Sequence, residues 1–101
     1  MNETQTHDVA VERLLSALCS LRTNDEARAL LADLLTPREL DDLAQRLEVA
    51  SLLDKGVSYV GVSRATGASS TTVSRVSKCL NGPCGGYRLV LDRLEGWDDL
   101  S

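Results

Sequence analysis

Reactive and aromatic side chains are scarce in this 101-residue sequence. It holds no Phe, one Trp and two Tyr, with three Cys and one His. Cys79 and Cys84 lack zinc-site spacing and have no nearby His, while His7 lies in a polar terminus. Neither a Gly-rich phosphate loop nor a nucleophile–base pair is present. The sequence therefore predicts no enzyme, no cofactor and no metal site.

Long apolar runs are also missing. No stretch approaches the roughly 18 residues that a membrane span needs, and residues 1–11 lack the cationic start and apolar stretch of a secretory signal. A content of 43% hydrophobic and 26% charged residues is typical of a globular protein. We expect a cytoplasmic protein with one domain over 9–95, a disordered tail over 1–8 and a second tail over 96–101. Whether Trp97, in that second tail, packs on the core is left open.

The formal net charge of −4 hides a segregation of charge along the chain. Residues 1–54 carry eleven carboxylates and five bases, and residues 91–101 carry four carboxylates and one base. Residues 55–90 carry five bases and no carboxylate. Such asymmetry suggests a local surface for a polyanion inside an acidic protein.

Apolar residues recur at helical spacing along the whole chain, which predicts an all-α fold of about six helices. Capping boxes at Thr23–Glu26 and Thr36–Glu39 start the second and third helices. Cys19, in the first helix (about 9–21), is interpreted as a small core residue. A Cys79–Cys84 disulfide is not expected without an export signal. The third helix is expected to end at Gly56 and to bury a stripe of apolar residues: Leu40, Leu43, Leu47, Ala50 and Leu53.

Two short helices, within 57–66 and over about 70–80, are joined by a turn that contains Gly67. This is the sequence form of a helix-turn-helix. At about 100° per residue, Val73, Val76 and Leu80 share one arc of the second helix. They are expected to pack on the third helix and on two residues of the first short helix, Val62 and Ala65.

The opposite arc carries only small hydroxyls and cations, which suit contact with double-stranded DNA. With Arg64 of the first short helix, the expected DNA-contacting residues are Ser70, Thr71, Ser74, Arg75 and Lys78. Lys55 and Arg88 are further candidates for phosphate contact at the rim. A merely solvated face is the alternative, but a run of Ser and Thr is unfavourable for such a helix.

Two stretches, Leu35-Thr36-Pro37 through Gly56 and 66–76, resemble the Trp-repressor superfamily. The closest resemblance is to its YerC/YecD branch, which shares Cys79-Leu80-Asn81 and the run from Gly86 to Leu91. The resemblance to this superfamily covers about residues 14–94. Thr-Val-Ser-Arg-Val also resembles the recognition helix of LacI-type repressors, but in those it lies at the amino end, ahead of a large sensor domain.

The resemblance implies an intertwined homodimer in which the amino-terminal helices of one chain pack into the other. A small chain that is poor in aromatic residues has limited core to bury alone, which agrees with this. Such a dimer places two recognition helices about 34 Å apart, one turn of DNA.

The resemblance also implies an effector pocket between the third helix and the recognition helix. Thr36, Arg46 and Arg75 stand at positions that match the corepressor site. A small Gly of the repressors is Val76 here, and a Ser that meets the amino group is Cys79. We therefore predict that Val76 fills part of the pocket as core and that tryptophan is not the effector. Arg46 and Arg75 are interpreted first as structural or phosphate-facing cations.

The leading hypothesis is a sequence-specific, homodimeric DNA-binding regulator of transcription, expected to act as a repressor. One alternative keeps the fold as a protein-interaction module without DNA binding, its acidic amino half facing a basic partner. Another keeps DNA binding and adds a small effector other than tryptophan in the pocket near Arg46 and Arg75.

Overall fold

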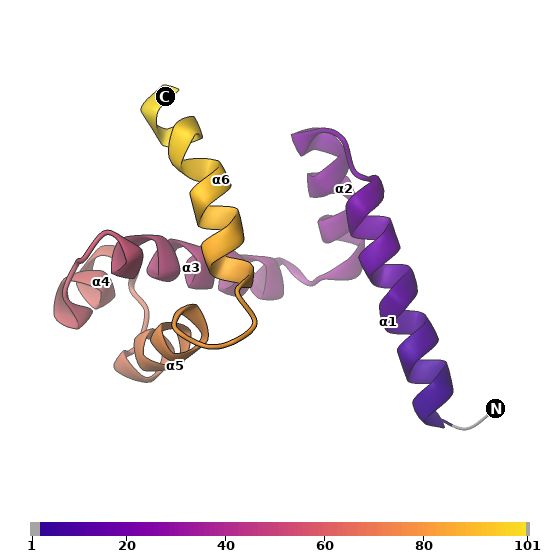
Figure 1. Ribbon diagram of the computed structural model, residues 1–101, viewed down its shortest axis with the longest axis horizontal. Coiled ribbons are helices and arrows are strands. Elements are labelled where there is room, and N and C mark those ends of the chain that lie inside the picture. The colour runs from indigo at the N-terminus through magenta and orange to yellow at the C-terminus, as the bar shows by residue number, and fades with distance from the viewer. Residues whose placement is uncertain (1–2, 101) are drawn as a thin grey trace. The chain divides into compact units, whose positions relative to one another are not determined.

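Six α-helices make up the computed structural model of the chain (Figure 1), which confirms the predicted all-α class. The structure describes the backbone of residues 3–100 and the side chains of residues 8–95. The helices are α1 Glu3–Ser20, α2 Asn24–Leu34, α3 Pro37–Asp54, α4 Tyr59–Thr66, α5 Ser70–Leu80 and α6 Gly86–Leu100. No helix in the described range is both long and apolar enough to cross a lipid bilayer.

The predicted capping box at Thr36–Glu39 forms in full, and the one at Thr23–Glu26 forms in part. The Thr36 hydroxyl accepts from the Glu39 amide at 3.2 Å, and the Glu39 carboxylate accepts from the Thr36 amide at 2.9 Å. The Thr23 hydroxyl likewise accepts from the Glu26 amide at 3.1 Å. The Glu26 carboxylate accepts from the amide of Arg22, one residue before the cap, at 2.9 Å. These bonds satisfy amides that a helix start leaves without partners.

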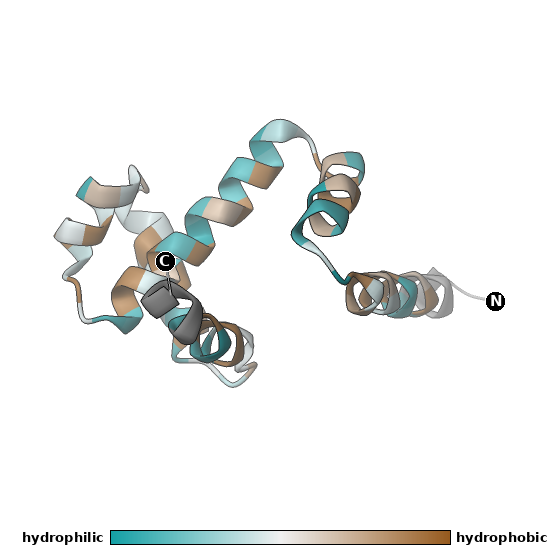
Figure 2. Cartoon of the chain, turned by 90° about the horizontal axis from the view of Figure 1, so that it is seen from above, coloured by the Kyte–Doolittle hydropathy of each residue, from teal (hydrophilic) through white to brown (hydrophobic). Residues whose placement is uncertain are grey.

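The chain forms two compact units, residues 1–40 and residues 41–101, with the boundary inside α3. In the first unit, no residue whose side chain is described is buried. Hydrophobic residues occur along α1 and α2 (Figure 2), and several large ones are exposed: Val9, Val11, Leu14, Leu15, Leu18 and Leu34. Cys19 is exposed as well, so its interpretation as a core residue is wrong for the single chain, because none of the described side chains of the first unit covers it.

The second unit holds the hydrophobic core of the chain. Its buried residues come from all four of its helices and the turn before α5: Val49, Ala50, Val62, Ala68, Val73, Val76, Leu80 and Leu91. The predicted arc of Val73, Val76 and Leu80 is thus confirmed. Half-buried Leu52, Leu53 and Tyr87 pack against this core.

Two details of the predicted packing are wrong. Ala65 is exposed, and the buried alanine is Ala68, which follows Gly67 and is returned to the core by the turn. In α3, Leu43 and Leu47 are exposed, whereas Val49 is fully buried beside Ala50. The core therefore lies along the carboxyl-terminal half of α3, and among the described residues none buries the Leu43 side of the predicted stripe.

The terminal helices extend beyond the bounds predicted for them. α1 begins at Glu3 and not near Val9, and α6 continues to Leu100 and not to about Glu95. Neither extension contains a proline, and Gly96 alone does not stop a helix. The division into one domain with two tails stays a prediction. The side chain of Trp97 lies outside the described residues, as do residues 1, 2 and 101.

Replacement of Thr36 with alanine should destabilise the fold by about 1 kcal/mol at neutral pH, the usual cost of a lost helix cap. The backbone and side-chain hydrogen bonds of Thr36 lower the pKa of Glu39 below its usual 4.5. A lowered pKa stabilises the folded state above the ordinary pKa, and this contribution is lost as the pH falls through the lowered value.

The difference in unfolding free energy between wild type and Thr36→Ala, measured in urea, should therefore shrink in acid. The pKa of Glu39, followed by NMR titration, should rise in the variant by the part that the Thr36 hydroxyl contributes, while the backbone amide of residue 36, the larger cause, continues to lower it. Glu48→Gln, on the same helix, is the control. An unchanged Glu39 pKa together with unchanged stability would contradict this interpretation of the cap.

Candidate nucleic-acid interface

The helix-turn-helix has the bounds that the sequence predicts, because each of its ends is capped. The Ser58 hydroxyl accepts from the Gly61 amide at 3.1 Å and starts α4. Gly67 ends α4 with φ at 75°, a left-handed conformation that glycine adopts without steric cost. The Ser69 hydroxyl then accepts from the Thr72 amide at 3.1 Å and starts α5. Local chemistry therefore determines where the turn lies.

Buried valines and two hydrogen bonds fix α5 against α4. Val62 of α4 and Val73 of α5 are both fully buried in the core. The Tyr59 hydroxyl donates to the Ser77 hydroxyl oxygen at 2.6 Å, and the Ser63 hydroxyl donates to the Ala68 carbonyl. The face of α5 opposite its valines is therefore held outward in one orientation.

This outward face presents most of the residues predicted to contact DNA. Ser70, Thr71, Arg75 and Lys78 are exposed, and Ser74 is half-buried. Arg64, exposed on α4, lines a groove together with Ser70. The ion pair between Arg88 and Asp54 involves none of these cations. The structure thus presents hydroxyls and cations on the exposed side of α5 and the adjoining part of α4.

Arg88, a predicted phosphate contact, is engaged within the protein. Its guanidinium donates to the Asp54 carboxylate at 2.7 Å and to the Asn81 side-chain oxygen at 2.9 Å. The Asn81 amide group in turn donates to the Ser77 carbonyl at 2.9 Å. Arg88 of α6 therefore connects the end of α3 with the end of α5. Lys55, the other rim candidate, is exposed just after α3.

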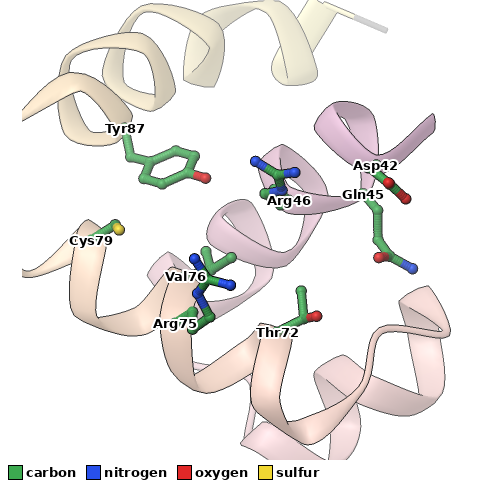
Figure 3. A pocket seen from close by; sticks show the side chains of 8 residues that line it. All are labelled: Asp42, Gln45, Arg46, Thr72, Arg75, Val76, Cys79 and Tyr87. Atoms are coloured by element: carbon green, nitrogen blue, oxygen red, sulfur yellow. The ribbon is translucent and has the colours of Figure 1, made fainter. Parts of the chain in front are cut away.

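A cavity of about 340 Å³ lies between α3, α5 and α6 (Figure 3). Arg46, Arg75, Val76 and Cys79, all predicted pocket residues, line it. Thr36, the fifth predicted residue, belongs to the other unit, where its hydroxyl caps α3. The lining also includes residues that the sequence did not single out: Asp42, Gln45, Thr72 and Tyr87.

Polar groups dominate the walls of this cavity. In Figure 3 the guanidinium groups of Arg46 and Arg75 lie at its centre, and the ring of Tyr87 extends across it from α6. Gln45 is held in place because its amide group donates to the Thr66 carbonyl at 3.2 Å. Val76 is only 3% exposed and belongs to the core, so it borders the cavity as a packed side chain. Cys79 is an exposed free thiol.

Comparison with known proteins identifies the fold and the family. Residues 10–95 match the family described as Trp repressor protein. The chain belongs to the Trp repressor family. Members of this family are regulators and not enzymes, which agrees with the expectation from the sequence.

Similarity to individual members extends over most of the chain. It is 40% identical to protein YerC of Bacillus subtilis (strain 168) over 85 residues, 84% of this chain and 82% of YerC. A TrpR-like protein from Eubacterium eligens superposes with a TM-score of 0.81 at 42% identity, covering 85% of this chain and 89% of that one. A Staphylococcus aureus protein superposes with a TM-score of 0.83 at 32% identity, covering 94% and 95%.

Proposed function

We propose that this Trp repressor family member is a cytoplasmic, homodimeric, sequence-specific DNA-binding protein that represses transcription. The observation that carries this proposal is the exposed face of α5. It presents hydroxyls and cations without a carboxylate, on a helix that fully buried Val62 and Val73 hold in place. A polyanion can approach such a surface closely, whereas the acidic remainder of the chain repels it.

We expect two kinds of contact with DNA, to bases and to phosphates, made by residues at different positions. The amino-terminal residues of a recognition helix reach base edges in the major groove, so Ser70 and Thr71 are proposed to contact bases. Arg64, Arg75 and Lys78 are proposed to neutralise phosphates, which positions the protein and supplies affinity for any sequence. Ser74 is half-buried and is proposed as a short-range contact between these two groups.

A second copy of the chain would cover the apolar side chains that this chain leaves exposed. Leu15 and Leu18 of α1 are 48% and 41% exposed, and the first unit buries none of its described side chains. The second unit offers a groove of about 540 Å³ whose apolar lining is Leu47, Leu91 and Leu94. Exposed apolar patches of this kind mark association surfaces. The proposed homodimer places the helices of the first unit of each chain on the second unit of its partner.

Tryptophan is not the proposed effector. Val76 and Cys79 line the cavity at the positions where the resemblance predicts Gly and Ser, and Val76 is packed into the core. The two arginines and the open volume of about 340 Å³ favour a second candidate function, in which a different small molecule binds here and regulates DNA binding.

The DNA-binding proposal predicts the salt dependence of affinity. If each Lys78 of the dimer neutralises one phosphate, Lys78→Gln removes two such contacts and should reduce the magnitude of the slope of log K against log salt by about 1.8 for duplexes of any sequence. Arg88→Gln should leave the slope unchanged, because Asp54 already pairs with that guanidinium. Fluorescence anisotropy with labelled duplexes at several salt concentrations measures both. Absence of any DNA retention at low salt would refute DNA binding and favour the protein-interaction module.

The dimer proposal predicts that a charged side chain introduced on the apolar face of α1 weakens the dimer. Wild type should sediment as a dimer at micromolar concentration. Leu18→Glu should weaken the dimer by about tenfold or more, because a buried unpaired carboxylate is costly. Ser16→Glu, on the same helix, is the matched control and should leave the dimer intact. A wild-type chain that sediments as a folded monomer would contradict the proposal.

Calorimetry tests the exclusion of tryptophan. Titration of the wild-type protein with tryptophan should give no binding isotherm in the micromolar range. If Val76 and Cys79 are the obstacle, the double variant Val76→Gly/Cys79→Ser should bind tryptophan more tightly than wild type. A micromolar dissociation constant for the wild-type chain would show that tryptophan is accommodated after all.

A further inference from the structure

Val60 is an apolar side chain on the surface proposed to face DNA. It is 63% exposed, the largest value among the exposed large hydrophobic side chains that the structure describes. It lies on α4, one helical turn before Arg64. Val60 therefore does not belong to the hydrophobic core, and no residue in the described part of the chain covers its side chain.

A shallow groove of about 220 Å³ connects Val60 with the start of the recognition helix. Its walls are Tyr59, Val60, Ser63 and Arg64 of α4 and Ser70 of α5. The Tyr59 hydroxyl bond to Ser77 at 2.6 Å fixes one wall of the groove. The Ser63 hydroxyl bond to the Ala68 carbonyl ties α4 to the turn before Ser70. Val60 is therefore held beside the part of α5 that is proposed to reach base edges.

The surface of the groove around Val60 is mostly apolar, and the polar groups at its edges are one cation and three hydroxyls. Arg64 is the only charged residue among the five that line the groove, and the three remaining neighbours of Val60 all carry hydroxyls. No carboxylate occurs anywhere in residues 55–90. The occupant that this surface fits therefore combines negative charge with a small apolar group. The major groove of DNA displays the hydrogen-bond donors and acceptors of the bases between two rows of phosphates. The apolar group in this groove is the 5-methyl group of thymine.

We propose that Val60, with the groove it shares with Tyr59 and Ser70, recognises the 5-methyl group of a thymine and so determines part of the operator sequence. This inference rests on the proposed DNA-binding function and adds a base preference to it. A protein partner is disfavoured, because one valine and one tyrosine bordered by a cation form a much smaller surface than the roughly 800 Å² per partner of a stable interface.

The test compares thymine with deoxyuridine, which lacks only the 5-methyl group. A duplex bound by the wild-type full-length chain is first selected from a random pool. Each thymine in it is then replaced singly by deoxyuridine, and dissociation constants are measured by fluorescence anisotropy. One thymine position in each half-site should lose about fourfold in affinity, the factor expected for one buried methyl group. Other thymines should show smaller changes.

The variant Val60→Ser separates this contact from other effects of the methyl group. Because Val60 is largely exposed, the substitution should leave thermal stability nearly unchanged. The variant should bind the thymine and deoxyuridine duplexes equally well, and its affinity should match that of wild type for the deoxyuridine duplex. Leu89→Ala, an exposed apolar residue on α6, is the matched control and should keep the fourfold ratio.

Two outcomes overturn the proposal, and they differ from failure of DNA binding itself. In the first, wild type discriminates thymine from deoxyuridine and Val60→Ser does so by the same factor, which assigns the contact to another residue such as Thr71. In the second, replacement of every thymine by deoxyuridine leaves the affinity of wild type unchanged, which shows that Val60 contacts no thymine methyl group. If no duplex is retained from the pool at low salt, the proposed function fails first.

Discussion

Packing between fully buried valines is the interaction on which the rest of the second unit depends. Val49 of α3, Val62 of α4 and Val73 of α5 have no exposed surface and belong to one hydrophobic core cluster. Because α4 has only eight residues, its own backbone hydrogen bonds would not keep it folded alone. Burial of one face of α5 dictates which face remains outside. The hydroxyl and cation surface, the groove at Val60 and the arginine-lined cavity are all consequences of that orientation.

Charged residues and exposed apolar residues are each distributed unevenly along the chain. Carboxylates are concentrated in residues 1–54 and 91–101, while residues 55–90 have none. The exposed leucines and valines of α1 and α2 belong to the acidic part of the chain. The surface proposed to associate with a second copy and the surface proposed to approach phosphate are therefore separated along the sequence. Asp54 modifies this division, because its carboxylate binds Arg88 and removes one cation from the positive segment.

Sequence reasoning predicted the elements whose causes are local. The cap at Thr36 and the turn at Gly67 determine helix ends within a few residues, and the periodicity of Val73, Val76 and Leu80 identifies the buried arc of α5. It failed where the outcome depends on distant residues. The Arg88–Asp54 pair joins positions 34 apart, and Tyr87 enters the cavity from a different helix. Cys19 and Leu43 lie in apolar stripes, but periodicity does not reveal whether this chain or another one covers them.

Selection of bound duplexes from a random pool by the full-length chain tests most directly whether this fold serves a two-fold DNA-binding regulator. The expected result is enrichment of sites with two-fold symmetry, with half-sites centred about 34 Å apart, one turn of the double helix. Enrichment of single, unpaired half-sites would contradict the dimeric arrangement. A pool that shows no enrichment and no retention at low salt would contradict DNA binding altogether.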